Sequence, residues 1–171
     1  IFHEAGADVC AVLGSSIESA KNTSIKLKDL YGINSQPYHC LDTLLEEVRP
    51  NAVSICTPPQ FHFEEIIAAF EKRIGVFCEK PLFWYSGISK LELEGRLAQI
   101  ETHPHRQLWV NTSNAYFVEQ IKKLVSPISK KNALTFCFET QGKNQGREIG
   151  VDLLPHGLSI ILELFGDNPI S

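Results

Sequence analysis

The sequence predicts an α/β protein built on a doubly wound parallel sheet of the Rossmann type. Strand-like and helix-like segments alternate along most of the 171 residues. The strand-like runs, such as NAVSIC at 51–56 and IGVFC at 74–78, are mainly apolar and do not alternate between apolar and polar residues. Continuous apolar runs are typical of parallel strands that helices cover on both faces. Ligands of such folds bind beyond the carboxyl ends of the strands, so the residues that follow each strand are the first candidates for a site.

The individual elements follow from periodicity and from the residues that start and stop helices. Gly32 is a candidate C-cap for the first helix, and Asp42 is a candidate N-cap for the second. The stretch QGKNQGREIG at 141–150 is polar and glycine-rich, which predicts a loop. Strands are expected at 7–13, 37–40, 51–56, 74–78, 107–111 and 133–140. Helices are expected at 16–31, 43–48, 61–72, 89–101, 117–125 and 154–165.

Composition and charge argue against several classes of protein. The net charge is −4, and no Lys/Arg-rich run indicates binding to nucleic acid or to an anionic membrane. No apolar stretch approaches the roughly 18 residues of a membrane helix, and the N-terminus lacks the pattern of a signal peptide. The cysteines are five, an odd number without a C-x-x-C pair, which predicts free thiols in a reducing cytoplasm. We expect no metal site, since His103-Pro104-His105 has no acidic or cysteine partner nearby.

The first candidate constellation is Thr57-Pro58-Pro59-x-x-His62, directly after a predicted strand. The two prolines remove two backbone donors and stiffen the turn. Such a turn can present carbonyls and a threonine hydroxyl to a flat ring, with His62 in the first turn of the next helix. The alternative is an ordinary strand-ending turn with a surface histidine.

The second constellation is Cys78-Glu79-Lys80-Pro81-Leu82, at the end of the next strand. The proline holds Lys80 in an extended backbone conformation. A lysine partly withdrawn from water can position a hydroxyl by hydrogen bonding, and Glu79 can take a ribose hydroxyl or pair with Lys80. The alternative is a surface Glu–Lys pair.

The third constellation is Asp152-x-x-x-His156, whose spacing puts both side chains on one side of a helical turn. Because proline is favoured in a first turn, Pro155 predicts a helix that starts close to Asp152. His156 would then lie near a helix N-terminus, which favours the neutral imidazole that can accept a proton from a hydroxyl. The alternative makes Asp152 an ordinary N-cap and His156 a half-buried helix residue.

These three motifs, in this order and at these spacings, resemble the glucose–fructose oxidoreductase / inositol dehydrogenase family (Gfo/Idh/MocA) over roughly residues 5–165. The resemblance implies hydride transfer between NAD or NADP and a hydroxyl-bearing carbon of a sugar or polyol. It implies that Lys80, Asp152 and His156 form the catalytic group, with Lys80 also contributing to cofactor binding. Thr57, Pro58, His62 and Glu79 match positions that line the nicotinamide and its ribose, and Asn114 is a candidate substrate contact.

The resemblance also implies an organisation. Residues 1–112 would form the cofactor-binding domain, and residues 113–171 would begin an α+β open-sheet domain for substrate binding and oligomerisation. The complete protein would be a homo-oligomer. Two other functions share the same residues: an NAD-assisted glycoside hydrolase of the family, and a catalytically silent sensor or structural subunit.

The chain departs from the family pattern at its beginning. It contains no G-x-G-x-x-G, and residues 1–6 resemble the end of the helix that follows that loop. We expect either that the first strand and the glycine loop belong to a longer protein or that the loop has been lost. After the strand at 7–13, Gly14-Ser15-Ser16 with Lys21 stands where an acidic residue takes the NAD ribose. This favours NADP, with an ordinary helix N-cap at Ser15 or Ser16 as the alternative.

Overall fold

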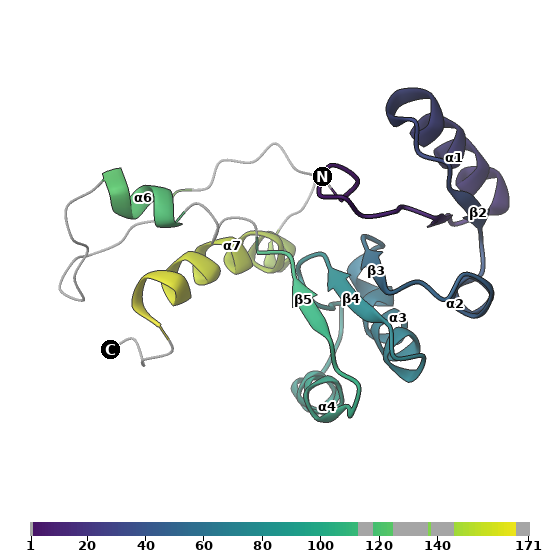
Figure 1. Cartoon of the computed structure of the whole chain (residues 1–171). Helices are drawn as coiled ribbons and strands as arrows, with labels where there is room; N and C mark the ends of the chain where they lie inside the picture. Colours follow the sequence, from purple (N-terminus) through teal and green to yellow (C-terminus); the bar gives the residue numbers. More distant parts are fainter. Residues whose placement is uncertain (1, 113–117, 125–136, 138–145, 167–171) are drawn as a thin grey trace.

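The computed structural model describes residues 2–112, 118–124, 137 and 146–166, and it is an α/β fold with parallel strands only among them (Figure 1). Its strands form two sheets, one of β1 and β2 and one in the order β3-β4-β5. The elements are β1 (Ala11–Leu13), α1 (Ile17–Tyr31), β2 (Gln36–Tyr38), α2 (Leu41–Glu47), β3 (Ala52–Ile55), α3 (Pro59–Glu71), β4 (Gly75–Cys78), α4 (Lys90–Thr102), β5 (Leu108–Val110), α6 (Val118–Leu124) and α7 (Arg147–Phe165).

In the unit of β1, α1 and β2, a tight turn at Gly14 connects β1 to α1. A Cβ atom on Gly14 would lie 2.6 Å from the backbone nitrogen of Ala20, so only glycine lets β1 turn this closely into α1. The predicted C-cap is confirmed, because Gly32 adopts the left-handed conformation and its N–H bonds to carbonyls of the last turn. The predicted N-cap at Asp42 is wrong. Helix α2 starts at Leu41, two residues before the expected start at 43, with Cys40 at the cap position and no side-chain cap bond.

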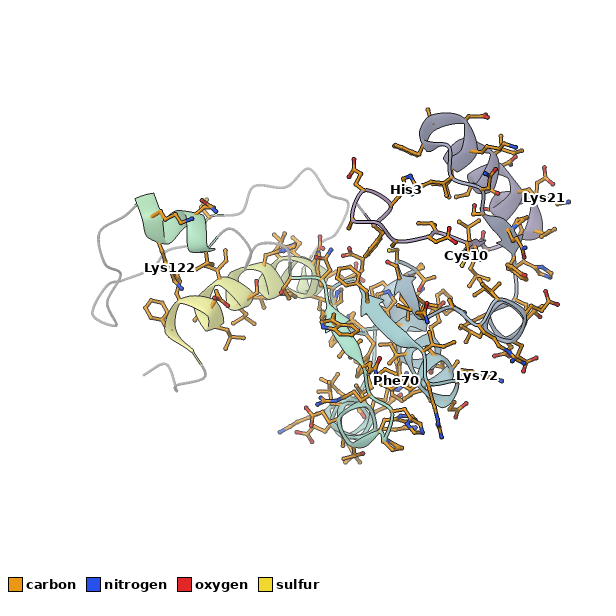
Figure 2. The ribbon with its side chains drawn as sticks, in the orientation of Figure 1. His3, Cys10, Lys21, Phe70, Lys72 and Lys122 are labelled. Atoms are coloured by element: carbon orange, nitrogen blue, oxygen red, sulfur yellow. The ribbon has the colours of Figure 1, made fainter. Side chains whose placement is uncertain are left out.

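The larger sheet contains the core of the described residues. Register pairs Ile55 with Cys78 and Cys78 with Val110, so β3, β4 and β5 end at one edge. Helix α3 covers this sheet with residues such as Ile66 and Phe70, both with no exposed surface. Figure 2 shows Phe70 among the packed side chains, whereas Lys72 extends outward from the end of the same helix. The continuous apolar run at 74–78 therefore indicated the buried strand β4 correctly, whereas β3 is buried only at Ile55 and exposes Ala52 and Ser54.

Helix α7 differs most from the prediction. It begins at Arg147 and runs through Pro155, so residues 147–150 are helical and not part of a loop. Proline removes its own N–H from the helix and its ring crowds the carbonyl four residues earlier, so a helix continues through it only at a cost of about 3 kcal/mol. Pro155 was therefore a misleading start signal. Asp152 lies inside the helix and is not its N-cap, and His156 is not near its N-terminus.

The predictions for the beginning of the chain and for residues after 112 have different outcomes. Residues 2–6 form a turn in which Gly6 N–H bonds to the His3 carbonyl, and not the helix end that was expected. The strand expected at 133–140 lies outside the described residues except for Cys137, which is in no regular element. Asn114 also lies outside them. None of the described helices combines the length and apolarity that crossing a membrane requires.

Candidate active site

The carboxyl edge of the larger sheet gathers the polar residues that follow its strands. Thr57 comes after β3, Glu79 and Lys80 after β4, and Asn111 after β5. Backbone bonds hold these loops together, since Glu79 N–H donates to the Ile55 carbonyl and Asn111 N–H donates to the Cys78 carbonyl. The predicted Thr57 and Glu79–Lys80 positions therefore meet at one edge of the sheet.

Lys80 reaches across this edge to helix α7. Its Nζ donates to Asp152 Oδ1 at 2.5 Å and to the Asp152 carbonyl at 2.9 Å. The lysine side chain is 18% exposed, so the ion pair is partly withdrawn from water. Pro155 has no N–H for the carbonyl of Val151, and Lys80 binds the neighbouring carbonyl at this interrupted turn. The contact joins residues that are 72 positions apart in the sequence. The partner of Lys80 is therefore Asp152, and the alternative of a surface ion pair between Glu79 and Lys80 is wrong.

His156 lies one helical turn after Asp152, within the electrostatic reach of this ion pair. Burial lowers its pKa below the ordinary value, and the nearby Lys80 lowers it further. Asp152 and Glu79 act in the opposite direction but less strongly. The imidazole is therefore held in the neutral form at neutral pH, as expected, although the cause is burial and Lys80 and not a helix N-terminus.

Glu79 has a partner that the sequence did not single out. Asn111 Nδ2 donates to Glu79 Oε1 at 2.5 Å, which fixes the carboxylate at the edge of the sheet. Sequence reasoning weighed the residues at the end of the strand expected at 107–111 but selected Asn114 as the candidate. The rule that parallel strands end together would have pointed to Asn111, since it follows β5 directly.

A second unpredicted carboxylate supports Thr57. The Thr57 hydroxyl donates to Glu65 Oε2 at 2.5 Å, and Glu65 is half-buried on α3. Burial raises the pKa of Glu65, although the bond from Thr57 and the nearby His62 act against this rise. No signal in the sequence separates Glu65 from the adjacent Glu64, because both stand in a helix that carries solvent-facing charges.

His62 is fully inside the protein, with 1% of its surface exposed, so the alternative of a surface histidine is wrong. Its Nε2 lies 2.6 Å from the Thr57 carbonyl, and its Nδ1 lies 3.1 Å from the Pro81 carbonyl. These contacts occupy both ring nitrogens with backbone atoms. Pro58, at the N-cap position of α3, is exposed beside them, and the Lys80–Pro81 peptide is cis.

The two serines predicted to bind the cofactor belong to the smaller sheet. Ser16 is the N-cap of α1, where its hydroxyl accepts the Ser19 N–H at 3.1 Å, and Ser15 is exposed beside it. Figure 2 shows Lys21 extending outward from α1. The N-cap alternative is thus correct for Ser16. Within the described part of the chain, no three His, Cys, Asp or Glu side chains gather as a metal site would require.

Comparison with known proteins assigns this architecture. Residues 2–112 match the family model described as "Oxidoreductase family, NAD-binding Rossmann fold" (Gfo/Idh/MocA). A D-glucoside 3-dehydrogenase of Escherichia coli (strain K12) is 34% identical over 74 residues, which are 43% of this chain and 20% of that protein.

Solved structures show the same fold. A myo-inositol 2-dehydrogenase from Lactobacillus plantarum has a TM-score of 0.55 and 23% identity, covering 70% of this chain and 33% of that one. A variant 3-ketoreductase from Actinomadura kijaniata, in complex with TDP-benzene and NADP, has a TM-score of 0.51 and 21% identity, covering 68% and 33%. The chain thus spans a fifth of the curated relative and about a third of these structures.

Proposed function

The chain belongs to the Gfo/Idh/MocA oxidoreductase family with its NAD-binding Rossmann fold, and we propose that the complete protein transfers a hydride between NAD(P) and a hydroxyl-bearing carbon of a sugar or polyol. The observation that carries the proposal is the Lys80–Asp152 ion pair beside His156, at the carboxyl edge of the sheet. The names of the sugar and inositol dehydrogenases that the chain resembles support the substrate class.

Each member of the group has a distinct role. His156, held neutral by burial and by Lys80, accepts the hydroxyl proton when the substrate is oxidised. An ammonium group has three donors, and Asp152 takes two of those on Lys80. The third can donate to the substrate oxygen and stabilise the charge that develops on it. Asp152 orients Lys80 and lies on the same face of α7 as His156.

The residues at the edge of the sheet fit a nicotinamide ribose. Glu79 offers a carboxylate that Asn111 already orients through one oxygen, and its other oxygen can accept a ribose hydroxyl. Thr57, Pro58 and His62 build the turn beside it, with Pro58 exposed. NAD(P) supplies the hydride acceptor when bound, and Lys80 contributes to its binding.

NADP is the cofactor that the proposal favours over NAD. Ser15 and Ser16 follow β1 where a carboxylate is usual, and Lys21 lies on the same helix. A serine hydroxyl and a lysine suit a 2′-phosphate better than a carboxylate does. A Ser16 hydroxyl that accepts from Ser19 still has its own proton to donate.

We also propose the organisation of the complete protein. Residues 1–112 form the cofactor domain, and residues 113–171 begin the domain that binds substrate through Asn114 and mediates homo-oligomer formation. The exposed apolar side chains of α7, which include Leu154 and Leu158, support further packing partners for this second part. The free cysteines support a reducing, cytoplasmic location.

The first experiment titrates the complete gene product with NADPH and NADH, following fluorescence, for the wild type and for Lys80→Ala. We expect tight binding of one cofactor and weakening of about tenfold or more in Lys80→Ala, equivalent to the loss of a charged hydrogen bond. Lys72→Ala is the matched control, since Lys72 also forms an ion pair, 2.9 Å from Glu46, but at the other end of the sheet. A folded protein that binds neither cofactor would contradict the proposal and favour a silent subunit.

A further inference from the structure

The loop of residues 81–88 directly follows Lys80 and connects β4 to α4. The middle of this loop lies against helix α3. Phe83 is 5% exposed, and its ring packs edge-on against the ring of Phe63 on α3, with the two centroids 5.6 Å apart. The place of the loop, and with it the start of the Lys80 side chain, therefore depends on how α3 and the loop are held together.

Arg96 of helix α4 contacts an aromatic ring on each side of this junction. The centre of its guanidinium lies 4.5 Å from the centroid of the Phe63 ring, which belongs to α3. It lies 5.6 Å from the centroid of the Tyr85 ring, which belongs to the loop. A cation within about 6 Å of a ring centroid is attracted to the face of the ring. One side chain of α4 therefore attracts both α3 and the loop.

Two carboxylates hold the guanidinium of Arg96 in this position. Its Nη1 donates to Glu64 Oε1 on α3 at 3.0 Å, and its Nη2 lies 3.2 Å from Glu92 Oε1 on α4. Isolated ion pairs at a surface contribute little to stability. Here the arginine side chain is only 21% exposed and combines two ion pairs with two ring contacts. The four contacts together connect α3, α4 and the loop after β4.

The chemistry of arginine suits this combination of contacts better than that of other cations. The N–H groups of a guanidinium point outward in its plane, toward carboxylates, and its flat faces remain free to stack on aromatic rings. A lysine ammonium carries the same charge but has no flat face. The identity of the residue at position 96 should therefore matter beyond its charge.

We propose that Arg96 is a positioning residue, which holds the loop of residues 81–88 against α3 and thereby keeps the Lys80 ammonium at the place where the reacting oxygen binds. The proposal rests on the proposed dehydrogenase function, because it assigns Arg96 an effect on turnover through Lys80. In this role Arg96 touches neither substrate nor cofactor, since its contacts are with side chains of α3, α4 and the loop.

The first measurement does not require activity. Hydrogen exchange of the complete protein, followed by mass spectrometry, monitors a peptide that covers residues 82–88. In this segment the Trp84 N–H donates to the Pro59 carbonyl at 3.2 Å and the Ile88 N–H donates to the Tyr85 carbonyl at 3.3 Å. In Arg96→Met, which fills similar space without charge or donors, we expect these amides to exchange about tenfold faster or more.

Two references separate release of the loop from a general loss of stability. A peptide that covers β4 should keep its exchange rate in Arg96→Met, since the core strand does not contact Arg96. Lys90→Met is the matched control, because Lys90 forms an ion pair on the same helix, 3.6 Å from Glu94, but is 87% exposed. Unchanged exchange at 82–88 in folded Arg96→Met, or equal acceleration at 82–88 and β4, would overturn the proposal. If Arg96→Met does not fold, the same comparison is made with Arg96→Lys.

Kinetics then test positioning against a purely stabilising role. In Arg96→Met, we expect kcat per folded molecule to fall about 10- to 100-fold, because small displacements of a catalytic group are costly, and KM for the substrate to change less than about threefold. Arg96→Lys keeps the charge, and it should restore the urea midpoint more fully than kcat. An unchanged kcat in folded Arg96→Met, or equal recovery of both quantities in Arg96→Lys, would overturn the proposal. Absence of turnover in the wild type would contradict only the dehydrogenase function, since the exchange measurement tests the loop independently.

Discussion

The loops after β3 and β4 are anchored in a buried core, whereas Asp152 and His156 stand on a helix with an exposed apolar face. Ile66, Phe70 and Cys78, which support the loops, have no exposed surface. On α7, Leu154 is 60% exposed and Leu158 is 50% exposed. The position of Lys80 is therefore dictated by the packing of the sheet, and that of His156 depends more on contacts such as the Lys80–Asp152 ion pair. Substitutions in the two regions should separate stability from chemistry.

The largest difference is expected in stability. Phe70→Ala removes a fully buried ring from the core and should lower the free energy of unfolding by about 3–5 kcal/mol. Leu158→Ala, at an exposed position on α7, should lower it by about 0.5 kcal/mol. Urea unfolding of the complete protein measures both. Equal losses of unfolding free energy in the two variants would show that α7 packs as firmly as the sheet, and would contradict the difference between the two regions.

The next largest effect is expected on the turnover rate, from a substitution on α7. His156→Gln removes the proton acceptor and should lower kcat about 10²- to 10⁴-fold, the range for general bases. The free energy of unfolding should change little, because His156 is only partly buried. A turnover assay and urea unfolding on the same preparation test both statements. Full activity in His156→Gln would assign the proton to another group.

The pH dependence sharpens this assignment. Because burial and Lys80 lower the pKa of His156, the neutral base persists as pH falls to the ordinary value of 6.5 and is lost only below it. Oxidation should therefore decline on the acid side below pH 6.5. Lys80→Met should raise the pKa of His156 and Asp152→Asn should lower it further, since these neighbours act in opposite directions. Proton NMR titration of His156 follows both shifts, and shifts of the same sign would contradict the assigned causes.

The contrast between the two regions also explains what the sequence could predict. Strand β4 leaves a continuous apolar run because its residues are buried or half-buried, and Gly32 marks the end of α1 by local backbone geometry. The start of α7 was missed because Pro155 suggested a first turn, whereas the helix continues through Pro155 and Lys80 binds the Asp152 carbonyl in the turn before it. Pairs such as Lys80–Asp152 join distant parts of the chain, so no local pattern specifies them. Only the family resemblance suggested that these residues act together.

A smaller effect is expected where one side chain orients another. Asn111→Ala removes the donor that holds Glu79 Oε1 and should weaken NAD(P)H binding about tenfold, near 1.4 kcal/mol, the lower end for a hydrogen bond to a charged group. Asn111→Asp places a second carboxylate beside Glu79 and should weaken binding further. Fluorescence titration compares the two variants. Unchanged affinity in both would show that Glu79 does not bind the cofactor.

The smallest effect separates the two roles of the serines after β1. Ser16→Ala removes the N-cap of α1 and should lower the free energy of unfolding by about 1 kcal/mol. Ser15→Ala leaves that cap in place, since Ser15 makes no cap bond to α1. If Ser15 helps to bind a 2′-phosphate, its substitution should weaken NADPH binding and leave NADH binding and stability unchanged. Equal effects of Ser15→Ala on NADPH and NADH would contradict the NADP preference, because only NADPH carries the phosphate that distinguishes the two cofactors.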